Sequence, residues 1–383
     1  MTANVLDGTL ELHPSAVQPT SGEADMARLW SSLAVAAGLL ASLVLPGTPH
    51  AAAATPAEPA TGVGCGTRVD RIPLDTRYNP QTHRYELVDT RRGGHRTSDL
   101  QGGTWGQGTL VTDVDNVWCD GGRQAAAVDA HYLHAVVWDY FLGVHGRKGV
   151  RDDGQGGCSL VHYGRDSAAV FWDGRCLTYG DGMYGGPSVL RIDTAAHEWA
   201  HGVTEATAAL GYSGESGALN EATGDIFATA VEFFARNPAD PGDYLIGEEP
   251  DINGNGTPLR YLDRPSRDGR SKDYWYPGIG GTDPHLSSGV ANHFFYLLAE
   301  GSGAKMIDGM RYDSPTYDGK PVAGIGRTAA ERIWYRALTA HMTPTTDYRA
   351  ARTATLTAAS DLYGQDSAQY RAVDAAWAAV NVR

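Results

Sequence analysis

Basic residues are scarce in this sequence. The 383 residues include 31 Lys and Arg against 45 Asp and Glu, which gives a formal net charge of −14. No run of lysine and arginine occurs, and no basic patch is interleaved with aromatic residues. Such a chain cannot neutralise a phosphate backbone, so we exclude nucleic acid as a partner. The acidic balance is typical of a soluble protein, or of carboxylates that hold hard cations.

The sequence also lacks an apolar run of the length that a membrane-spanning helix usually needs. Residues 29–45 (LWSSLAVAAGLLASLVL) are uncharged, follow Arg28 and precede the small-residue tract 51–54. This is the layout of a secretory signal peptide with an Ala-x-Ala cleavage site. The polar stretch before Met26 does not fit a signal, so we expect translation to start at Met26 and the mature protein to be secreted, with no membrane contact. The alternative is an uncleaved anchor behind a longer tail.

Cysteine is rare, and no pair has the C-x-x-C spacing of a zinc or redox motif. The four cysteines fit two disulfides in an exported protein, with three connectivities open. The short loop between Cys158 and Cys176 favours that pair, which leaves Cys65 with Cys119.

The chain length predicts about two domains, and strand-like segments followed by helical segments predict an α+β fold. We expect a leader and linker over residues 1–60. The Pro/Ala-rich sequence that indicates the linker covers residues 55–64. A strand-rich N-terminal domain would follow over 61–209 and a helical C-terminal domain over 210–383. Helical periodicity is found in the segments 125–145, 193–208, 216–236, 290–300, 328–341, 348–363 and 367–380. In the first of these helices, His131 and His134 have no acidic partner at ligand spacing, so we expect packing or surface roles.

The segment HEWAH, residues 197–201, places two histidines four residues apart. On a helix they project from one face, so His197 and His201 can hold one metal ion, with Asp193 in the position of an N-cap. An H-E-x-x-H pattern also occurs by chance in unrelated chains, so the remaining ligands have to come from elsewhere.

A second helix, SGALNEATGDIFATAVEFF, begins at Ser216, the expected N-cap, and carries Glu221 and Asp225 on one face. A solvated acidic face is one interpretation. The turn YSGES before this helix instead folds it back on the first, which brings Glu221 to the histidines. Two imidazoles and one carboxylate leave a fourth position open, as in a catalytic zinc site. Asp225 would then hold the far N–H of a liganding histidine.

These segments resemble the active-site region of the thermolysin-like zinc endopeptidases. The similarity continues in AAAVDAHYLHAVVWDYF upstream, and in DPHLSSGVANHFFYLLAEG and the C-terminal helices downstream, from Gly62 to the end. The resemblance implies a thermolysin-like two-domain fold with a zinc cleft between the domains. It also implies one catalytic zinc on His197, His201 and Glu221, with protein or peptide substrates and a monomeric enzyme.

The resemblance also implies roles for other residues. Glu198 would be the general base that takes a proton from the attacking water. Tyr212 and His285 would stabilise the oxyanion. Arg260 matches an arginine that binds a substrate carbonyl and braces the site. Leu259, Ile246 and Thr194 match the wall of a pocket for an apolar residue on the leaving side of the scissile bond.

Calcium is the second metal that the resemblance implies. At least one structural ion is expected from carboxylates behind the zinc site: Asp193, Glu232, Asp243 and Glu248. Leu245 stands where the family often has a further glutamate, so we expect one ion where some relatives have a pair. The segment DVDN, with Asp113 and Asp115, resembles another calcium loop, and we leave that site open.

Two features depart from the family pattern. Ala169 stands where an asparagine usually contacts the substrate main chain, and only about ten residues fit between the leader and the enzyme, where a long propeptide is usual. The rival hypothesis is a secreted, metal-stabilised binding protein without catalysis. An exopeptidase is a weaker rival, because no residue for capturing a chain terminus is evident. Retention of Glu198, Tyr212 and His285 favours the enzyme.

Overall fold

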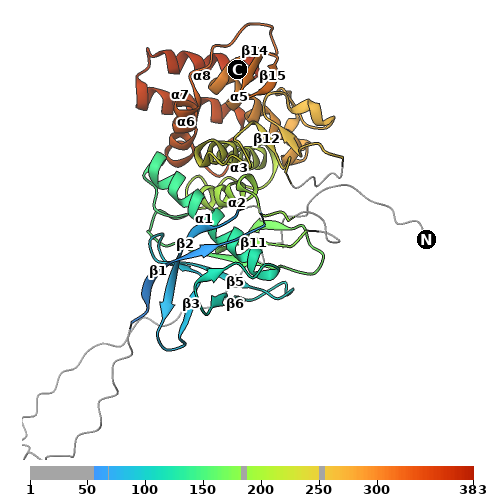
Figure 1. The fold of residues 1–383 in the computed structure, drawn as a ribbon. Helices are drawn as coiled ribbons and strands as arrows, with labels where there is room; N and C mark the ends of the chain where they lie inside the picture. The colour runs from blue at the N-terminus through green and yellow to red at the C-terminus, as the bar shows by residue number, and fades with distance from the viewer. Residues whose placement is uncertain (1–55, 68, 183–187, 250–254) are drawn as a thin grey trace, which may run out of the picture.

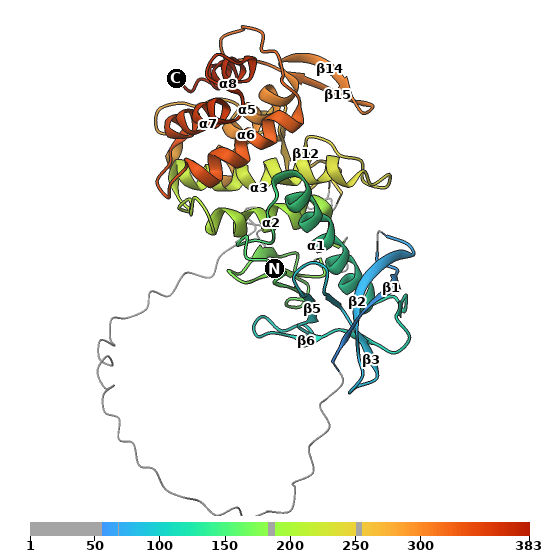
Figure 2. The same cartoon turned by 90° about the vertical axis from the view of Figure 1, so that its left-hand side faces the viewer.

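The computed structural model describes residues 56–67, 69–182, 188–249 and 255–383. The predicted signal sequence and the start at Met26 lie outside these residues. A strand-rich N-terminal half and a helical C-terminal half stack on each other, with helices α2 and α3 between them (Figures 1 and 2). The predicted α+β, two-domain architecture is confirmed.

The N-terminal half contains two sheets. The first has the strand order β7-β3-β2-β1-β8 and the second the order β10-β11-β9-β5-β4, with β6 paired to β5. In β2, Leu74 and Thr76 are buried on one face, the alternation expected of a half-covered strand. The strands are β1 Glu58–Gly64, β2 Ile72–Asn79, β3 Arg84–Glu86, β4 Val88–Asp89, β5 His95–Asp99, β6 Thr109–Leu110, β7 Thr112–Asp113, β8 Val117–Trp118, β9 Cys158–Val161, β10 Val170–Trp172 and β11 Cys176–Tyr179.

The predicted linker is wrong in its second half. Residues 58–64 form β1, which pairs along its whole length with β2, from Glu58 opposite Tyr78 to Gly64 opposite Ile72. Proline and alanine are tolerated there because Pro59 lies near the exposed start of the strand. Composition alone suggested a linker, whereas cross-strand pairing decides the structure.

Both predicted disulfides are confirmed. Cys65 is bonded to Cys119, and Cys158 to Cys176. The second bond joins two neighbouring parallel strands, in which Cys176 lies directly opposite Cys158. It therefore ties β11, the strand beside the edge strand β10, to the interior of the sheet.

Helix α1 (Arg123–His145) has most of its apolar residues buried, and it packs against β5, β9 and α2. His131 and His134 are buried packing residues, as expected. With His95 they form a histidine cluster, in which the rings of His95 and His134 stack at 3.4 Å. His95 Nδ1 and His134 Nε2 both donate to the Gly156 carbonyl, at 3.1 and 2.8 Å. Burial, the largest cause, lowers the pKa of all three imidazoles.

Two packed helices form the centre of the molecule. Helix α2 spans Ile192–Glu205 and α3 spans Gly214–Ala235. The predicted N-caps are wrong: Arg191 precedes α2 and Ser213 precedes α3, so Asp193 lies in the first turn of α2 and Ser216 inside α3. Thr194 Oγ1 accepts from the Arg191 N–H at 3.1 Å and fixes the beginning of α2.

Further helices complete the C-terminal half. The side chain of Asp347 accepts from the Ala350 N–H, and that of Ser367 from the Tyr370 N–H, so local capping sets two of the helix starts. One hydrophobic cluster runs from Leu74 in β2 to Val382 near the C-terminus, so the halves share a core. The remaining elements are β12 Leu245–Ile246, β13 Arg260–Tyr261, α4 Pro284–Ser287, α5 Gly289–Glu300, β14 Gly303–Ile307, β15 Met310–Ser314, α6 Arg327–Ala340, α7 Tyr348–Tyr363 and α8 Ala368–Ala379, with 3-10 turns at Pro265–Asp268 and Ile279–Gly281.

Candidate metal centre and cleft

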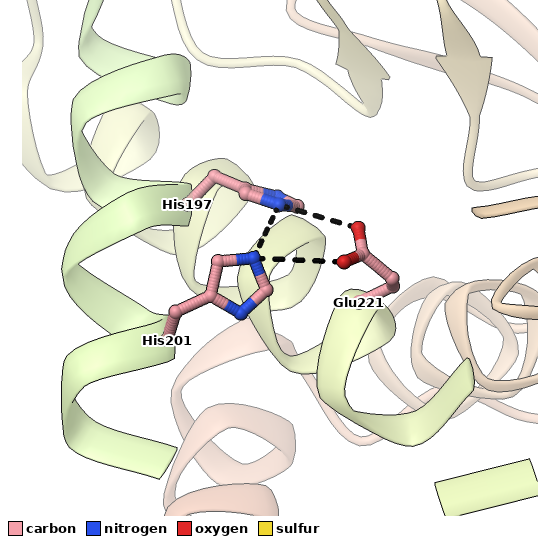
Figure 3. A group of neighbouring side chains, drawn as sticks. All are labelled: His197, His201 and Glu221. Atoms are coloured by element: carbon pink, nitrogen blue, oxygen red, sulfur yellow. Dashed lines mark hydrogen bonds and ion pairs between the residues drawn. The ribbon is translucent and has the colours of Figure 1, made fainter. Parts of the chain in front are cut away.

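His197 and His201 lie one turn apart on α2 and face α3 (Figure 3). Their Nε2 atoms are 3.0 Å apart. His197 Nδ1 is 3.0 Å from the Asp225 carboxylate and His201 Nδ1 is 2.8 Å from the Asn220 side-chain oxygen. Both partners accept hydrogen bonds, so in the neutral imidazoles each Nδ1 carries the proton and each Nε2 presents a lone pair. Two lone pairs that converge at this distance call for a cation between them.

Glu221, on α3, provides the third group. Its two oxygens are 3.4 Å from His197 Nε2 and 3.6 Å from His201 Nε2, and its side chain is fully buried. Glu221 Oε2 has no hydrogen-bond partner among the described residues. A buried carboxylate oxygen without a donor is costly unless a cation is bound. The three residues therefore fit a zinc ion, with two nitrogens and one oxygen as ligands.

Two α3 residues orient the histidines. Asp225 accepts from His197 and, through both oxygens, from Arg260 at 2.6 and 2.7 Å, while Asn292 donates to it at 2.7 Å. Burial alone would raise the pKa of this carboxyl, but the Arg260 ion pair and the His197 hydrogen bond outweigh it and hold the pKa well below its usual range. Asn220, which the sequence did not indicate, holds His201 and is itself fixed by donating to the Leu210 carbonyl.

Close packing of α2 on α3 depends on a glycine. A Cβ added at Gly224 would lie against the His197 ring. The absence of a side chain at this position thus allows the metal-binding face of α2 to approach α3.

Glu198 lies beside the histidines but is not part of the three-residue group. Its side chain is 5% exposed, and Oε2 accepts from the Trp172 backbone N–H at 3.1 Å. Burial, the largest cause, raises the pKa of its carboxyl, and the neighbouring histidines oppose this.

Tyr212 and His285 also approach the Glu221 carboxylate. The Tyr212 hydroxyl donates to Glu221 Oε1, and His285 Nε2 lies 3.4 Å from Glu221 Oε2. His285 lies in the short helix α4, where Asp283 accepts from its backbone N–H and its Nδ1. Its buried Nε2 has no hydrogen-bond partner in the described part of the chain, so it is available to a ligand.

A cavity of about 370 Å³ adjoins the metal centre. His197, Glu198 and His285 line it together with Val170 of the edge strand β10 and Ala168, which precedes that strand. Its apolar walls include Val189, Thr194, Ile246 and Leu259. The Thr194 hydroxyl donates to the Val189 carbonyl at 2.7 Å and is occupied with backbone groups. Arg260 also lines this cavity, although its guanidinium is paired with Asp225.

Comparisons with known proteins agree with this geometry. Residues 61–205 match the model of the thermolysin metallopeptidase catalytic domain, and residues 208–382 match that of its alpha-helical domain. The chain belongs to the thermolysin family. Membership implies zinc binding, which the converging lone pairs support independently.

Two named relatives of the thermolysin family differ in how similar their sequences are to this chain. The transglutaminase-activating metalloprotease of Streptomyces mobaraensis is 59% identical over 303 residues, 78% of this chain and 40% of that protein. Thermolysin of Bacillus sp. (strain EA1) is 40% identical over 333 residues, 84% of this chain and 57% of that protein. This chain therefore spans about half the length of these relatives.

A solved structure, the precursor of protealysin, a metalloproteinase from Serratia proteamaculans, superposes with a TM-score of 0.59. It is 27% identical and covers 76% of this chain and 87% of its own. The likeness extends the family assignment to the three-dimensional fold. Among the described residues, none of the helices combines the length and apolarity of a membrane span.

The carboxylates that the resemblance assigns to calcium form an acidic cluster around Asp193, in the first turn of α2. Oxygens of Asp193, Glu232 and Glu248 lie within 4.8 Å of one another. Glu232 is fully buried, and neither of its oxygens has a hydrogen-bond partner in the described ranges. Such a group fits a hard cation.

Asp243 lies close enough to repel this cluster, as does Asp240, which the sequence did not indicate. Burial is the largest cause of the raised pKa values: about 9 for Glu248, about 7 for Asp240 and about 6 for Asp243. Repulsion from Asp193 raises each of them further.

The carboxylates of the DVDN segment, Asp113 and Asp115, do not form a comparable group of converging oxygens. Asp113 is buried, but its Oδ1 accepts from the backbone N–H groups of Asp115 and Asn116. Asp115 Oδ1 accepts from the Val117 N–H. These carboxylates stabilise the turn after β7, and no three-residue metal group forms there within the described residues.

Proposed function

We propose that this protein is a secreted zinc-dependent endopeptidase. The observation that carries the proposal is the cavity beside the edge strand β10. His197, the buried Glu198, and a His285 Nε2 without a hydrogen-bond partner among the described residues border it together. A metal-stabilised binding protein would need the three ligands but neither Glu198 nor His285 in this arrangement.

His197, His201 and Glu221 hold the zinc ion in this proposal. When bound, zinc acts as a Lewis acid that activates water and polarises a peptide carbonyl. Asp225 and Asn220 keep the Nδ1 proton on each histidine, so both Nε2 atoms stay available as ligands.

Glu198 acts as the general base, taking a proton from the attacking water and delivering it to the leaving nitrogen. Its burial removes competing bulk water. The Tyr212 hydroxyl donates to the oxygen that becomes negatively charged. His285 donates to it through Nε2 in the imidazolium form, in which Asp283 accepts from Nδ1. Arg260 braces Asp225 and lies at the cavity wall, where it can reach a substrate carbonyl.

The substrate is an extended peptide or protein segment that pairs with β10. The hydrogen bond from the Gly180 N–H to the Ala169 carbonyl, and that from the Asp173 N–H to the Cys176 carbonyl, direct odd-numbered residues toward β11. Val170 therefore directs its backbone N–H and carbonyl to the open edge, where a substrate strand can add. Trp172 offers its carbonyl there, since its N–H donates to Glu198. Ala169 contributes no side-chain hydrogen bond.

The pocket next to the zinc site accepts an apolar residue on the leaving side of the scissile bond. Val189, Ile246 and Leu259 form apolar walls. Because the Thr194 hydroxyl is bonded to backbone carbonyls, its methyl group is what remains for the pocket. We infer a preference for Leu, Phe, Ile or Val.

The acidic cluster of Asp193, Glu232 and Glu248, together with the neighbouring Asp243, holds one calcium ion that stabilises the fold without taking part in the reaction. Support comes from burial of Glu232 with both oxygens unpartnered among described residues. We further propose that the enzyme acts outside the cell, as a monomer, with the domains divided at 61–209 and 210–383.

Casein digestion by the purified protein tests the function. We expect hydrolysis that a zinc chelator abolishes and that added zinc restores. A protein that binds zinc at this site yet leaves casein and apolar peptides intact would support the binding-protein alternative.

A further inference from the structure

Trp172, the last residue of the edge strand β10, contacts α2 at two acidic residues. Its backbone N–H donates to Glu198 Oε2 at 3.1 Å, and its indole Nε1–H donates to Glu205 Oε2 at 2.7 Å. Glu198 and Glu205 are seven residues apart, two helical turns, so they share one face of α2. Trp172 thus spans the α2 face that carries the proposed base.

Gly202 lies on this face between the two acids. A Cβ added there would lie 3.1 Å from Trp172 Cε2 and 2.7 Å from Val150 Cγ1. Glycine is unfavourable inside a helix compared with alanine. Here the missing side chain provides the space that the indole occupies.

The Trp172 N–H is the one hydrogen-bond donor that Glu198 has among the described residues. The terminal torsion of a glutamate side chain is broad, so a single fixed donor strongly affects its orientation. A base has to be held within hydrogen-bond reach of the proton it accepts. The position of Trp172 therefore bears directly on the position of the Glu198 carboxylate.

We propose that Trp172 is a positioning residue for Glu198 and that Gly202 and Glu205 fix Trp172 on α2. The proposal rests on the proposed function, because it takes Glu198 as the general base. It assigns Gly202 and Glu205 a role in turnover although neither borders the cavity.

Gly202→Ala is the first test. The new methyl group displaces the indole, so kcat should fall about 10- to 100-fold, as for a misplaced catalytic group, with KM little changed. Val150→Ala combined with Gly202→Ala removes the second clash and should keep the kcat defect. The matched control is Gly143→Ala in α1, where an added Cβ meets nothing within 4 Å. This control should raise the unfolding midpoint and leave kcat unchanged.

Glu205 offers a second test at a partly exposed position. Glu205→Ala removes the acceptor of the indole N–H and should lower kcat roughly threefold to tenfold. Glu205→Gln keeps an acceptor oxygen and should restore most of kcat. Arg151→Ala removes the ion pair with Glu205, at 3.2 Å, but not the indole bond, and should leave kcat unchanged.

A readout independent of turnover is the indole N–H resonance of Trp172, assigned by its loss in Trp172→Phe. It should shift in Glu205→Ala and stay in place in Arg151→Ala. Normal kcat in both Gly202→Ala and Glu205→Ala, in a protein that Glu198→Gln inactivates, would overturn this inference alone. Normal activity of Glu198→Gln would instead overturn the proposed function on which this inference rests.

Discussion

Replacing Asp225 by alanine should weaken zinc binding and destabilise the fold at the same time. Asp225 is fully buried and accepts four hydrogen bonds, from His197, Asn292 and twice from Arg260. Without it, the Arg260 guanidinium, whose side chain is 14% exposed, loses its partner. Removing one partner of a buried ion pair typically costs about 3–5 kcal/mol of unfolding free energy.

The effect on zinc follows from His197. Loss of the acceptor at Nδ1 frees the imidazole to rotate and to exchange tautomers, so zinc affinity should fall about 10- to 100-fold. Asp225→Asn keeps one acceptor oxygen but loses the charge, and its two effects should be smaller. Urea unfolding of the metal-free protein measures the first effect, and zinc competition with a chelating indicator measures the second.

A matched control separates the two effects. Asp263 is also buried and pairs with an arginine, Arg267, at 3.3 Å. Its hydrogen bonds come from Arg267 and the Asp313 N–H and involve neither metal-binding histidine. Asp263→Ala should lower the unfolding free energy without changing zinc affinity. Zinc affinity within about twofold of the parent in a folded Asp225→Ala protein would exclude Asp225 as the residue that orients His197 for zinc.

Three further predictions concern the rest of the molecule. Removing calcium while zinc is retained should lower the melting temperature, because the acidic cluster then repels itself and mass action no longer favours the folded state; a melting temperature independent of calcium would argue against the site. In saturating calcium, stability should fall as the pH drops below about 6.5, because the histidine cluster is held neutral by burial while the unfolded chain takes up protons. His134→Gln should reduce that slope in urea titrations, and an unchanged slope would exclude the cluster as its source. Mass spectrometry of the secreted protein should find a mature N-terminus between about Ala52 and Gly62 and no free thiol; four cysteines that alkylate without reductant would contradict the expected export.

Much of the fold and of the site could be predicted, because the sequence patterns that indicate them lie within short segments of the chain. The four-residue spacing of His197 and His201 fixes a shared helix face whatever the rest of the chain does. Helix α7 spans the predicted residues 348–363, since its apolar periodicity and the Asp347 cap agree. The short Cys158–Cys176 loop likewise favoured the pairing that the structure shows.

What sequence missed depends on contacts between distant segments. A hydrogen bond from the Arg191 N–H to Thr194 Oγ1 fixes the start of α2. Asp193 does not cap the helix, and its Oδ2 accepts from the distant Gly247 N–H at 2.7 Å. Asn220 looks like any polar helix residue until α3 packs on α2 and brings it to His201. Trp172 and Glu198 are 26 residues apart, and their contact exists only once the edge strand lies across the helix.

The central claim is that Glu198 is the general base of a zinc peptidase. Glu198→Gln is nearly isosteric and still accepts from the Trp172 N–H, but it cannot take a proton from water. Turnover of an apolar Gly-Leu peptide should be compared at matched zinc occupancy, with folding and inhibitor binding as controls. We expect unchanged zinc content and hydrolysis reduced at least about 10²-fold. Rates that agree within a few-fold would exclude Glu198 as the general base.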